Sequence, residues 1–126
     1  MEIERLDHIV LTVKDINRTV AFYTQVLGME HITFGNNRSA LAFGSQKINL
    51  HEKGNEFEPK AKSPTCGSAD ICFIAKTNIE LVKSEIEAKG ITILEGIVQR
   101  TGAIGKIRSI YLRDPDGNLL EISNYE

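Results

Sequence analysis

The segment HIVLTVKDINRTVAFYTQVLG (8–28) determines the fold, because a second segment, DICFIAKTNIELVKSEIEAKG (70–90), repeats its pattern. In both segments a short apolar strand is followed by a residue suited to capping a helix, Asp15 in the first and Thr77 in the second. Apolar residues at helical spacing come next. Two copies of one strand and helix unit are the economical explanation of this self-similarity.

The two predicted helices end at glycines that occupy matching positions, Gly28 and Gly90. Each helix carries one apolar stripe, which is expected to face the core rather than a cofactor. The stripe residues are Ile16, Val20, Tyr23 and Leu27 in the first helix, and Ile79, Val82 and Ile86 in the second.

Three further strand signals follow each glycine, so each copy reads βαβββ. We predict an α+β fold of one domain, in which two βαβββ modules, about 5–51 and 68–124, form a curved mixed sheet around a cleft, with the helices on the outer face. Residues 52–67, rich in Pro, Gly, Lys and Glu, are the predicted linker. The strand signals are MEHITF (29–34), SALAF (39–43), KINLHE (47–52), ITILEGIV (91–98), RSIYL (108–112) and NLLEIS (118–123).

Composition excludes several classes of function. A chain of 126 residues that is 41% hydrophobic suits one packed domain. Its 15 basic and 17 acidic residues are interspersed, which argues against nucleic acid as a partner. There is no apolar run of membrane length and no leader pattern, so a cytoplasmic protein without membrane contact is expected. Cys66 and Cys72 lack CxxC spacing, and Cys72 is expected to be a small core residue.

Pleat alternation selects the residues that point into the predicted cleft. The apolar neighbours of Glu121 in the last strand are expected to face a helix, which sends Glu121 to the cleft. The matching strand of the first copy sends Asn49 and His51 there, and the two opening strands contribute His8 and Asp70. Each of these residues alone has an ordinary structural explanation. Four repeat-related positions that carry imidazole and carboxylate groups instead favour a site for a divalent transition metal.

Other side chains are candidates for substrate binding. Arg38, Arg100 and Arg108 lie near strand ends, and we expect them on the cleft side, where they can meet an anionic substrate. Tyr111 and Phe34 are candidates for lining the cavity, although strand aromatics more often belong to the core.

Two segments, LDHIVLTVKDINRTVAFYTQVLGME (6–30) and IYLRDPDGNLLEIS (110–123), resemble the vicinal oxygen chelate superfamily, which groups glyoxalases, bleomycin-resistance proteins and extradiol dioxygenases. With the repeat, the resemblance covers nearly the whole chain. The chain is similar to small stand-alone glyoxalase-domain proteins, some of which are described as virulence-associated. The resemblance implies paired βαβββ modules, a homodimer and one divalent metal ion, with Ni, Zn, Mn or Fe as the options.

The resemblance also implies a ligand set. His8 matches the first ligand of the family and Glu121 the last. Where glyoxalase I-like members have glutamate in KIEL, this chain has Asn49 in KINL, and His51 follows on the same face. Where many members have a second histidine, this chain has Asp70. A His8, His51 and Glu121 set resembles the two-histidine, one-carboxylate triad, with Asp70 as a fourth ligand or as an acceptor for a ligand imidazole.

The function implied is a metal-dependent enzyme of glyoxalase type, such as a lactoylglutathione lyase-like isomerase. Glu121 is the expected ligand and proton carrier. One alternative is other chemistry on the same metal, either thiol transfer to an antibiotic or ring-opening dioxygenation. Another alternative is a metal-free protein of bleomycin-resistance type that sequesters a small molecule.

Overall fold

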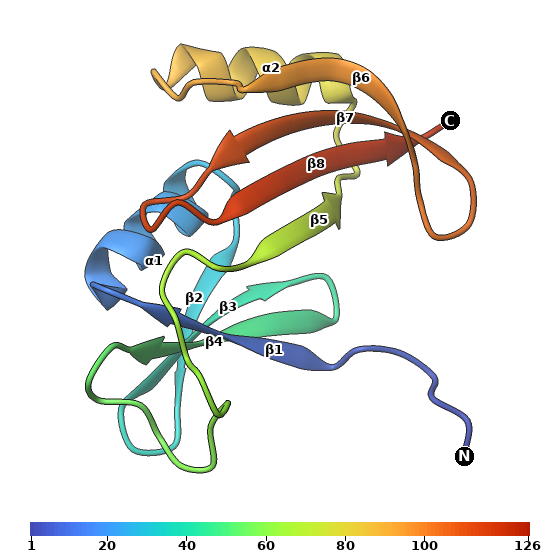
Figure 1. Cartoon of the computed structure of the whole chain (residues 1–126). Coiled ribbons are helices and arrows are strands. Elements are labelled where there is room, and N and C mark those ends of the chain that lie inside the picture. The colour runs from blue at the N-terminus through green and yellow to red at the C-terminus, as the bar shows by residue number, and fades with distance from the viewer. The chain divides into compact units, whose positions relative to one another are not determined.

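A computed structural model describes residues 1–126, and its elements repeat the order βαβββ twice (Figure 1). Contacts divide the chain into Met1–Gly67, here called the first module, and Ser68–Glu126, the second module. The predicted α+β fold of two βαβββ modules is confirmed. The elements are β1 (His8–Val13), α1 (Ile16–Gln25), β2 (Glu30–Phe34), β3 (Arg38–Phe43), β4 (Gln46–Glu52), β5 (Asp70–Ile74), α2 (Ile79–Ala88), β6 (Glu95–Thr101), β7 (Lys106–Arg113) and β8 (Leu119–Tyr125).

Each module contains its own four-stranded mixed sheet, and the two sheets share one topology. The strand order is β1-β4-β3-β2 in the first module and β5-β8-β7-β6 in the second. The opening strand of each module pairs in parallel with the closing strand, and all other pairs are antiparallel. The helix between the first two strands provides the crossover that parallel pairing requires.

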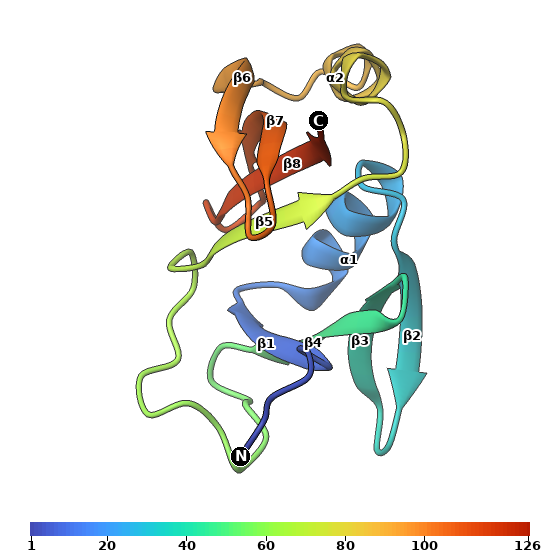
Figure 2. The same ribbon diagram turned by 90° about the vertical axis from the view of Figure 1, so that its right-hand side faces the viewer.

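Each helix packs on one face of the sheet in its own module. α1 contacts β2, β3 and β4, and α2 contacts β7 and β8 (Figure 2). Apolar side chains alternate along the strands, so one face of each sheet is buried against the helix. The fully or nearly fully buried residues are Leu11, Val13, Tyr23, Leu41, Ile48 and Leu50 in the first module, and Ile79, Ile86, Ile110, Leu112, Leu120 and Ile122 in the second.

The helix boundaries agree with the predicted caps except at the start of α2. Asp15 caps α1, as predicted. α2 is capped by Asn78, whose side-chain oxygen accepts a 3.0 Å bond from the backbone N–H of Glu80, and the predicted cap Thr77 lies one residue before it. Gly28 and Gly90 end the helices with φ of 70° and 76°, a left-handed conformation that glycine adopts without strain.

β6 begins later than the predicted strand at 91–98. The backbone N–H of Ile91 bonds to the carbonyl of Ile86 at 3.3 Å, so it completes the end of α2 and is not available for strand pairing. β6 starts at Glu95 and extends to Thr101, with a register shift between Gly96 and Val98. None of the helices is both long enough and apolar enough to cross a membrane.

Candidate functional site

The uncovered face of the first sheet carries His8, Asn49 and His51. β1 and β4 pair with His8 opposite Lys47, Val10 opposite Asn49 and Thr12 opposite His51. Paired residues of neighbouring strands point to the same face, and this face is the one opposite α1.

The same register separates His8 from His51. Their levels along the strand pair are four residues apart, which corresponds to about 13 Å at 3.3 Å per residue. Asn49 lies only two residues from the level of His8, or about 7 Å. Asn49 is therefore the nearer of the two candidate neighbours of His8.

The second module repeats this register and identifies the counterpart of Glu121. β5 and β8 pair with Asp70 opposite Leu119 and Cys72 opposite Glu121. Glu121 therefore lies two residues from the level of Asp70, as Asn49 does from the level of His8. From the sequence, either Asn49 or His51 could be the residue of the first module that corresponds to Glu121. The strand pairing identifies Asn49 as that residue.

The His8 imidazole is held by its neighbour in the chain. Nδ1 of His8 lies 2.8 Å from Oδ1 of Asp7, and this bond is the main cause that lowers the pKa of the Asp7 carboxyl below its usual value. Nε2 makes no hydrogen bond, and the side chain is 45% exposed. A carboxylate at one ring nitrogen orients the other nitrogen toward a metal in many metalloproteins.

His51 has a different environment. It is buried, its Nε2 lies 3.4 Å from Nη2 of Arg38, and its ring packs edge to face on Phe57. Burial, followed by the charge of Arg38, lowers the pKa of His51, which favours the neutral imidazole. The guanidinium lies against Nε2 of the ring, and its positive charge repels a metal cation.

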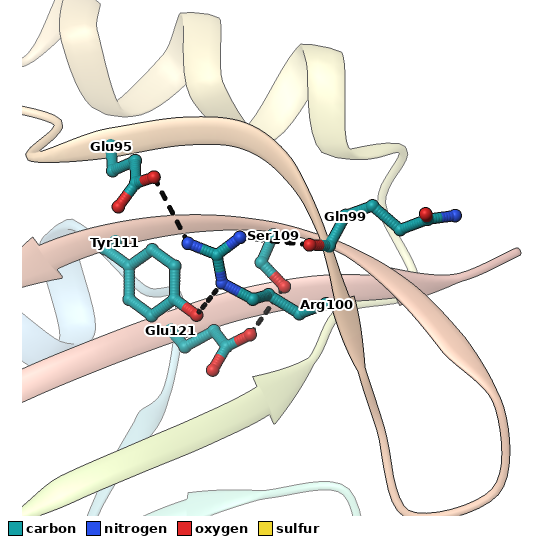
Figure 3. Close-up of polar contacts among 6 residues, drawn as sticks. All are labelled: Glu95, Gln99, Arg100, Ser109, Tyr111 and Glu121. Carbon is teal, nitrogen blue, oxygen red and sulfur yellow. Dashed lines mark hydrogen bonds and ion pairs between the residues drawn. The ribbon is translucent and has the colours of Figure 1, made fainter.

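Glu121 lies on the uncovered face of the second sheet and is held by two buried serines. The hydroxyl of Ser109 donates a 2.6 Å bond to Oε2 of Glu121 (Figure 3). The hydroxyl of Ser123 approaches the same oxygen at 3.5 Å. Ser109 and Ser123 are also bonded to each other at 2.7 Å, and neither is exposed. Both bonds use Oε2, which leaves Oε1 for another ligand.

Tyr111 and Arg100 lie beside Glu121. Tyr111 is the direct partner of Glu121 in the β7–β8 register, and Nε of Arg100 donates a 3.1 Å bond to its hydroxyl (Figure 3). Nη2 of Arg100 pairs with Glu95 at 3.2 Å. Burial is the main cause that raises the pKa of Tyr111, and the Glu121 charge adds to it. The phenol therefore stays protonated and can donate a hydrogen bond.

Arg108 does not lie on this face, contrary to expectation. Its Nη2 forms an ion pair with Glu80 of α2 at 2.5 Å. Arg108 alternates with Ser109 and Tyr111 along β7, so it lies on the face that packs against α2.

Cys72 is another correction, because it is exposed and does not belong to the core. It lies opposite Glu121 in the register, and its Sγ is 3.4 Å from the Ser123 hydroxyl. Desolvation of the sulfur raises the pKa of the thiol, and the Glu121 charge raises it further. Cys72, Ser109 and Ser123 were not among the site residues predicted from the sequence, although alternation places Cys72 and Ser123 on the face of Asp70 and Glu121.

Neither module by itself brings three His, Cys, Asp or Glu side chains together in a metal-binding arrangement. The first module presents His8 beside Asn49, and the second presents Glu121 diagonal to Asp70. Phe34 lies on the face of His51, under the charged groups of Arg38 and Lys47.

Comparison with known proteins places these observations in a family context. The model of the Glyoxalase/Bleomycin resistance protein/Dioxygenase superfamily matches residues 5–122. The chain is 62% identical over 125 residues to Virulence protein STM3117 of Salmonella typhimurium, covering 99% of this chain and 87% of that protein. It is 52% identical over 126 residues to Glyoxalase domain-containing protein RDO1 of Mycosarcoma maydis, covering 100% and 71%. The crystal structure of STM3117 matches with a TM-score of 0.99 over 100% of both chains.

More distant relatives have names that specify an activity. Metallothiol transferase FosB of Staphylococcus epidermidis is 26% identical over 122 residues, covering 97% of this chain and 82% of that protein. The crystal structure of the fosfomycin resistance protein FosX of Listeria monocytogenes, complexed with Mn(II) and sulfate, is 25% identical with a TM-score of 0.68, covering 99% and 93%.

Proposed function

The chain belongs to the Glyoxalase/Bleomycin resistance protein/Dioxygenase superfamily, and from that membership we propose that it is a divalent-metal-dependent enzyme of glyoxalase type. Its substrate is a small oxygenated molecule or a thiol adduct. The observation that carries the proposal is the Glu121 carboxylate, which buried Ser109 fixes on the uncovered face of the second sheet.

We assign His8, Asp70 and Glu121 as the protein ligands of the metal. His8 fits because Asp7 orients its ring and Nε2 is unbonded. Glu121 fits because its two hydrogen bonds leave Oε1 available. Asp70 is exposed and lies on the face of Glu121.

The other two predicted ligands, His51 and Asn49, are not assigned to the metal. The Arg38 guanidinium beside His51 argues against a metal there, and an amide such as Asn49 is a weak transition-metal ligand. A set of one imidazole and two carboxylates is rich in oxygen. Among the four metals considered, such a set favours Mn(II) or Fe(II) over Zn(II) and Ni(II).

The side chains around Glu121 have distinct proposed roles. A metal held by His8, Asp70 and Glu121 would supply the polarisation of a substrate carbonyl oxygen. Glu121 accepts a proton from the adjacent carbon and returns it to the neighbouring position, while Ser109 keeps the carboxylate oriented. Tyr111 donates a hydrogen bond to a substrate oxygen, and Arg100 supplies positive charge beside it.

The test is a screen for isomerisation of hemithioacetals, formed from 2-oxoaldehydes and low-molecular-weight thiols, with Mn(II) or Fe(II) added. Glu121→Gln is expected to lower kcat by about 100-fold or more, since general acid–base groups contribute on that scale. Glu85→Gln removes an exposed carboxylate of α2 and is expected to leave kcat unchanged. Turnover that needs no metal, or full activity of Glu121→Gln, contradicts the proposal.

Thiol transfer to an electrophilic antibiotic is the second candidate. It is favoured by the similarity to Metallothiol transferase FosB and by Asn49, which replaces the carboxylate of glyoxalase I-like members. Mass spectrometry of mixtures of the protein, Mn(II), fosfomycin and cysteine or glutathione distinguishes the two functions. A covalent adduct supports transfer, whereas a thioester formed from the hemithioacetal supports isomerisation.

We also propose a homodimer, as the family resemblance implies. Light scattering of the purified protein tests this, and a mass of 14.0 kDa in solution contradicts it.

A further inference from the structure

Two cations of the first module, Arg38 and Lys47, lie against one aromatic ring and have no carboxylate partner. Arg38 and Lys47 form no ion pair within 4.0 Å. Both lie against the Phe34 ring, with the Arg38 guanidinium carbon 5.0 Å and Lys47 Nζ 3.8 Å from its centroid. The guanidinium carbon also lies 4.6 Å from the centroid of the Phe57 ring. We call these four residues the cation–aromatic cluster.

One hydrogen-bond donor in this cluster is buried without an acceptor. Nε of Arg38 is inaccessible to solvent and makes no hydrogen bond, whereas Nη2 contacts His51 at 3.4 Å. A buried guanidinium N–H without an acceptor is costly, because its hydration is lost and not replaced. The nearby amide oxygen of Asn49 is likewise buried and unbonded. Neither atom has a hydrogen-bond partner within the protein.

Three carboxylates of the first module that interact electrostatically with His51 or Lys47 have other partners. Glu56 accepts a bond from the backbone of Gly54 at 3.1 Å, and Glu58 pairs with Lys60 at 3.0 Å. Asp7 interacts electrostatically with Lys47, but its carboxylate is hydrogen-bonded to His8. No carboxylate of the chain therefore forms an ion pair with Arg38 or Lys47.

We propose that the cation–aromatic cluster of Phe34, Arg38, Lys47 and Phe57 is a subsite for the carboxylate of a small planar acid. The guanidinium is planar and positively charged, and Lys47 adds a second positive charge, so the cluster attracts a carboxylate. The flanking rings favour a flat molecule over a tetrahedral one. The cluster lies on the same sheet face as His8 and Asn49. The identification of this acid as the substrate rests on the proposed function.

Binding is tested apart from catalysis, on the full chain treated with EDTA. Benzoate is the probe, titrated by calorimetry and by the Arg38 Nε–H signal in ¹⁵N spectra. We expect saturable binding that Arg38→Gln weakens about tenfold or more, in line with the loss of a hydrogen bond to a charged group. Arg108→Gln is the matched control, because it removes the same charge from the second module, where Arg108 pairs with Glu80 of α2, and it is expected to change the affinity less than twofold.

The contrary outcomes are distinct. No binding of benzoate, or equal weakening by Arg38→Gln and Arg108→Gln, overturns the subsite. Tighter binding of inorganic phosphate than of benzoate overturns the carboxylate assignment. Thermal unfolding of each variant tests whether it is folded. If Arg38→Gln does not fold, Lys47→Gln provides an independent test of the subsite. His8→Ala separates the two proposals, because it is expected to abolish metal-dependent activity and retain benzoate binding.

Discussion

The hydroxyl of Ser109 on β7 lies 2.6 Å from Oε2 of Glu121 on β8, and Ser109 is completely buried. A charge-assisted bond of this length is stronger than one between neutral groups. Ser109 is in turn fixed by its bond to Ser123. The orientation of the carboxylate is thus set by strand pairing inside one module, before any ligand arrives.

Ser109→Ala tests this positioning. The variant leaves Glu121 in place but free to rotate, so kcat is expected to fall about tenfold, within the range measured when an orienting contact is lost, while KM changes little. Ser84→Ala is the control, since Ser84 bonds only to a carbonyl within α2. Equal loss of kcat in both variants, or an effect confined to KM, argues against a positioning role.

The proximity of Cys72 to Glu121 predicts a change in thiol reactivity. The Glu121 charge contributes to the raised pKa of Cys72, so Glu121→Gln is expected to lower this pKa. The measurement is the alkylation rate by iodoacetamide as a function of pH, resolved by peptide mass spectrometry. The profile of Cys72 is expected to move to lower pH, with Cys66 as the internal control. An unchanged or opposite shift shows that the two groups do not interact.

The lowered pKa of His51 predicts that stability depends on pH. The unfolded state binds a proton near the ordinary value of about 6.5, more readily than the folded state does. Stability is therefore complete above that pH and declines as the pH falls toward the folded pKa. Urea unfolding of the EDTA-treated protein between pH 7.5 and 5 is expected to show this decline, with a shallower slope in His51→Gln. His31→Gln is the exposed control, and equal slopes in all three proteins contradict the prediction.

Gly96 is expected to tolerate no side chain. Its φ is 131°, and a Cβ there falls 2.7 Å from the carbonyl oxygen of Ser109. Gly96→Ala is expected to lower the free energy of unfolding by about 2 kcal/mol or more, from backbone strain and the clash. Gly105→Ala, in the same hairpin, places its Cβ no closer than 3.9 Å to Tyr125 and is expected to cost much less. Equal losses in both variants contradict this account of the bulge.

Much of the fold follows from local patterns in the sequence. The repeat, the helix stripes and the alternation in Ile48 and Leu50 are local, and the structure reproduces them. The same alternation places Arg108 with Ile110 and Leu112, so its position on the helix side was accessible from sequence.

The sequence could not decide whether Asn49 or His51 corresponds to Glu121, because the register of β1 with β4 depends on residues far apart in the chain. The serine support of Glu121 was equally hidden, since it depends on how β7 pairs with β8. The burial of His51 and its contact with Arg38 also depend on tertiary packing, which pleat alternation does not describe.

Manganese binding tests the central assignment of His8, Asp70 and Glu121 most directly. Free Mn(II) is measured by electron paramagnetic resonance during titration of the EDTA-treated protein and its variants. We predict one ion per chain, affinity lowered by more than about 100-fold in His8→Ala and in Glu121→Gln, and unchanged affinity in His51→Gln. Absence of stoichiometric binding, or a loss in His51→Gln as large as in His8→Ala, contradicts the account.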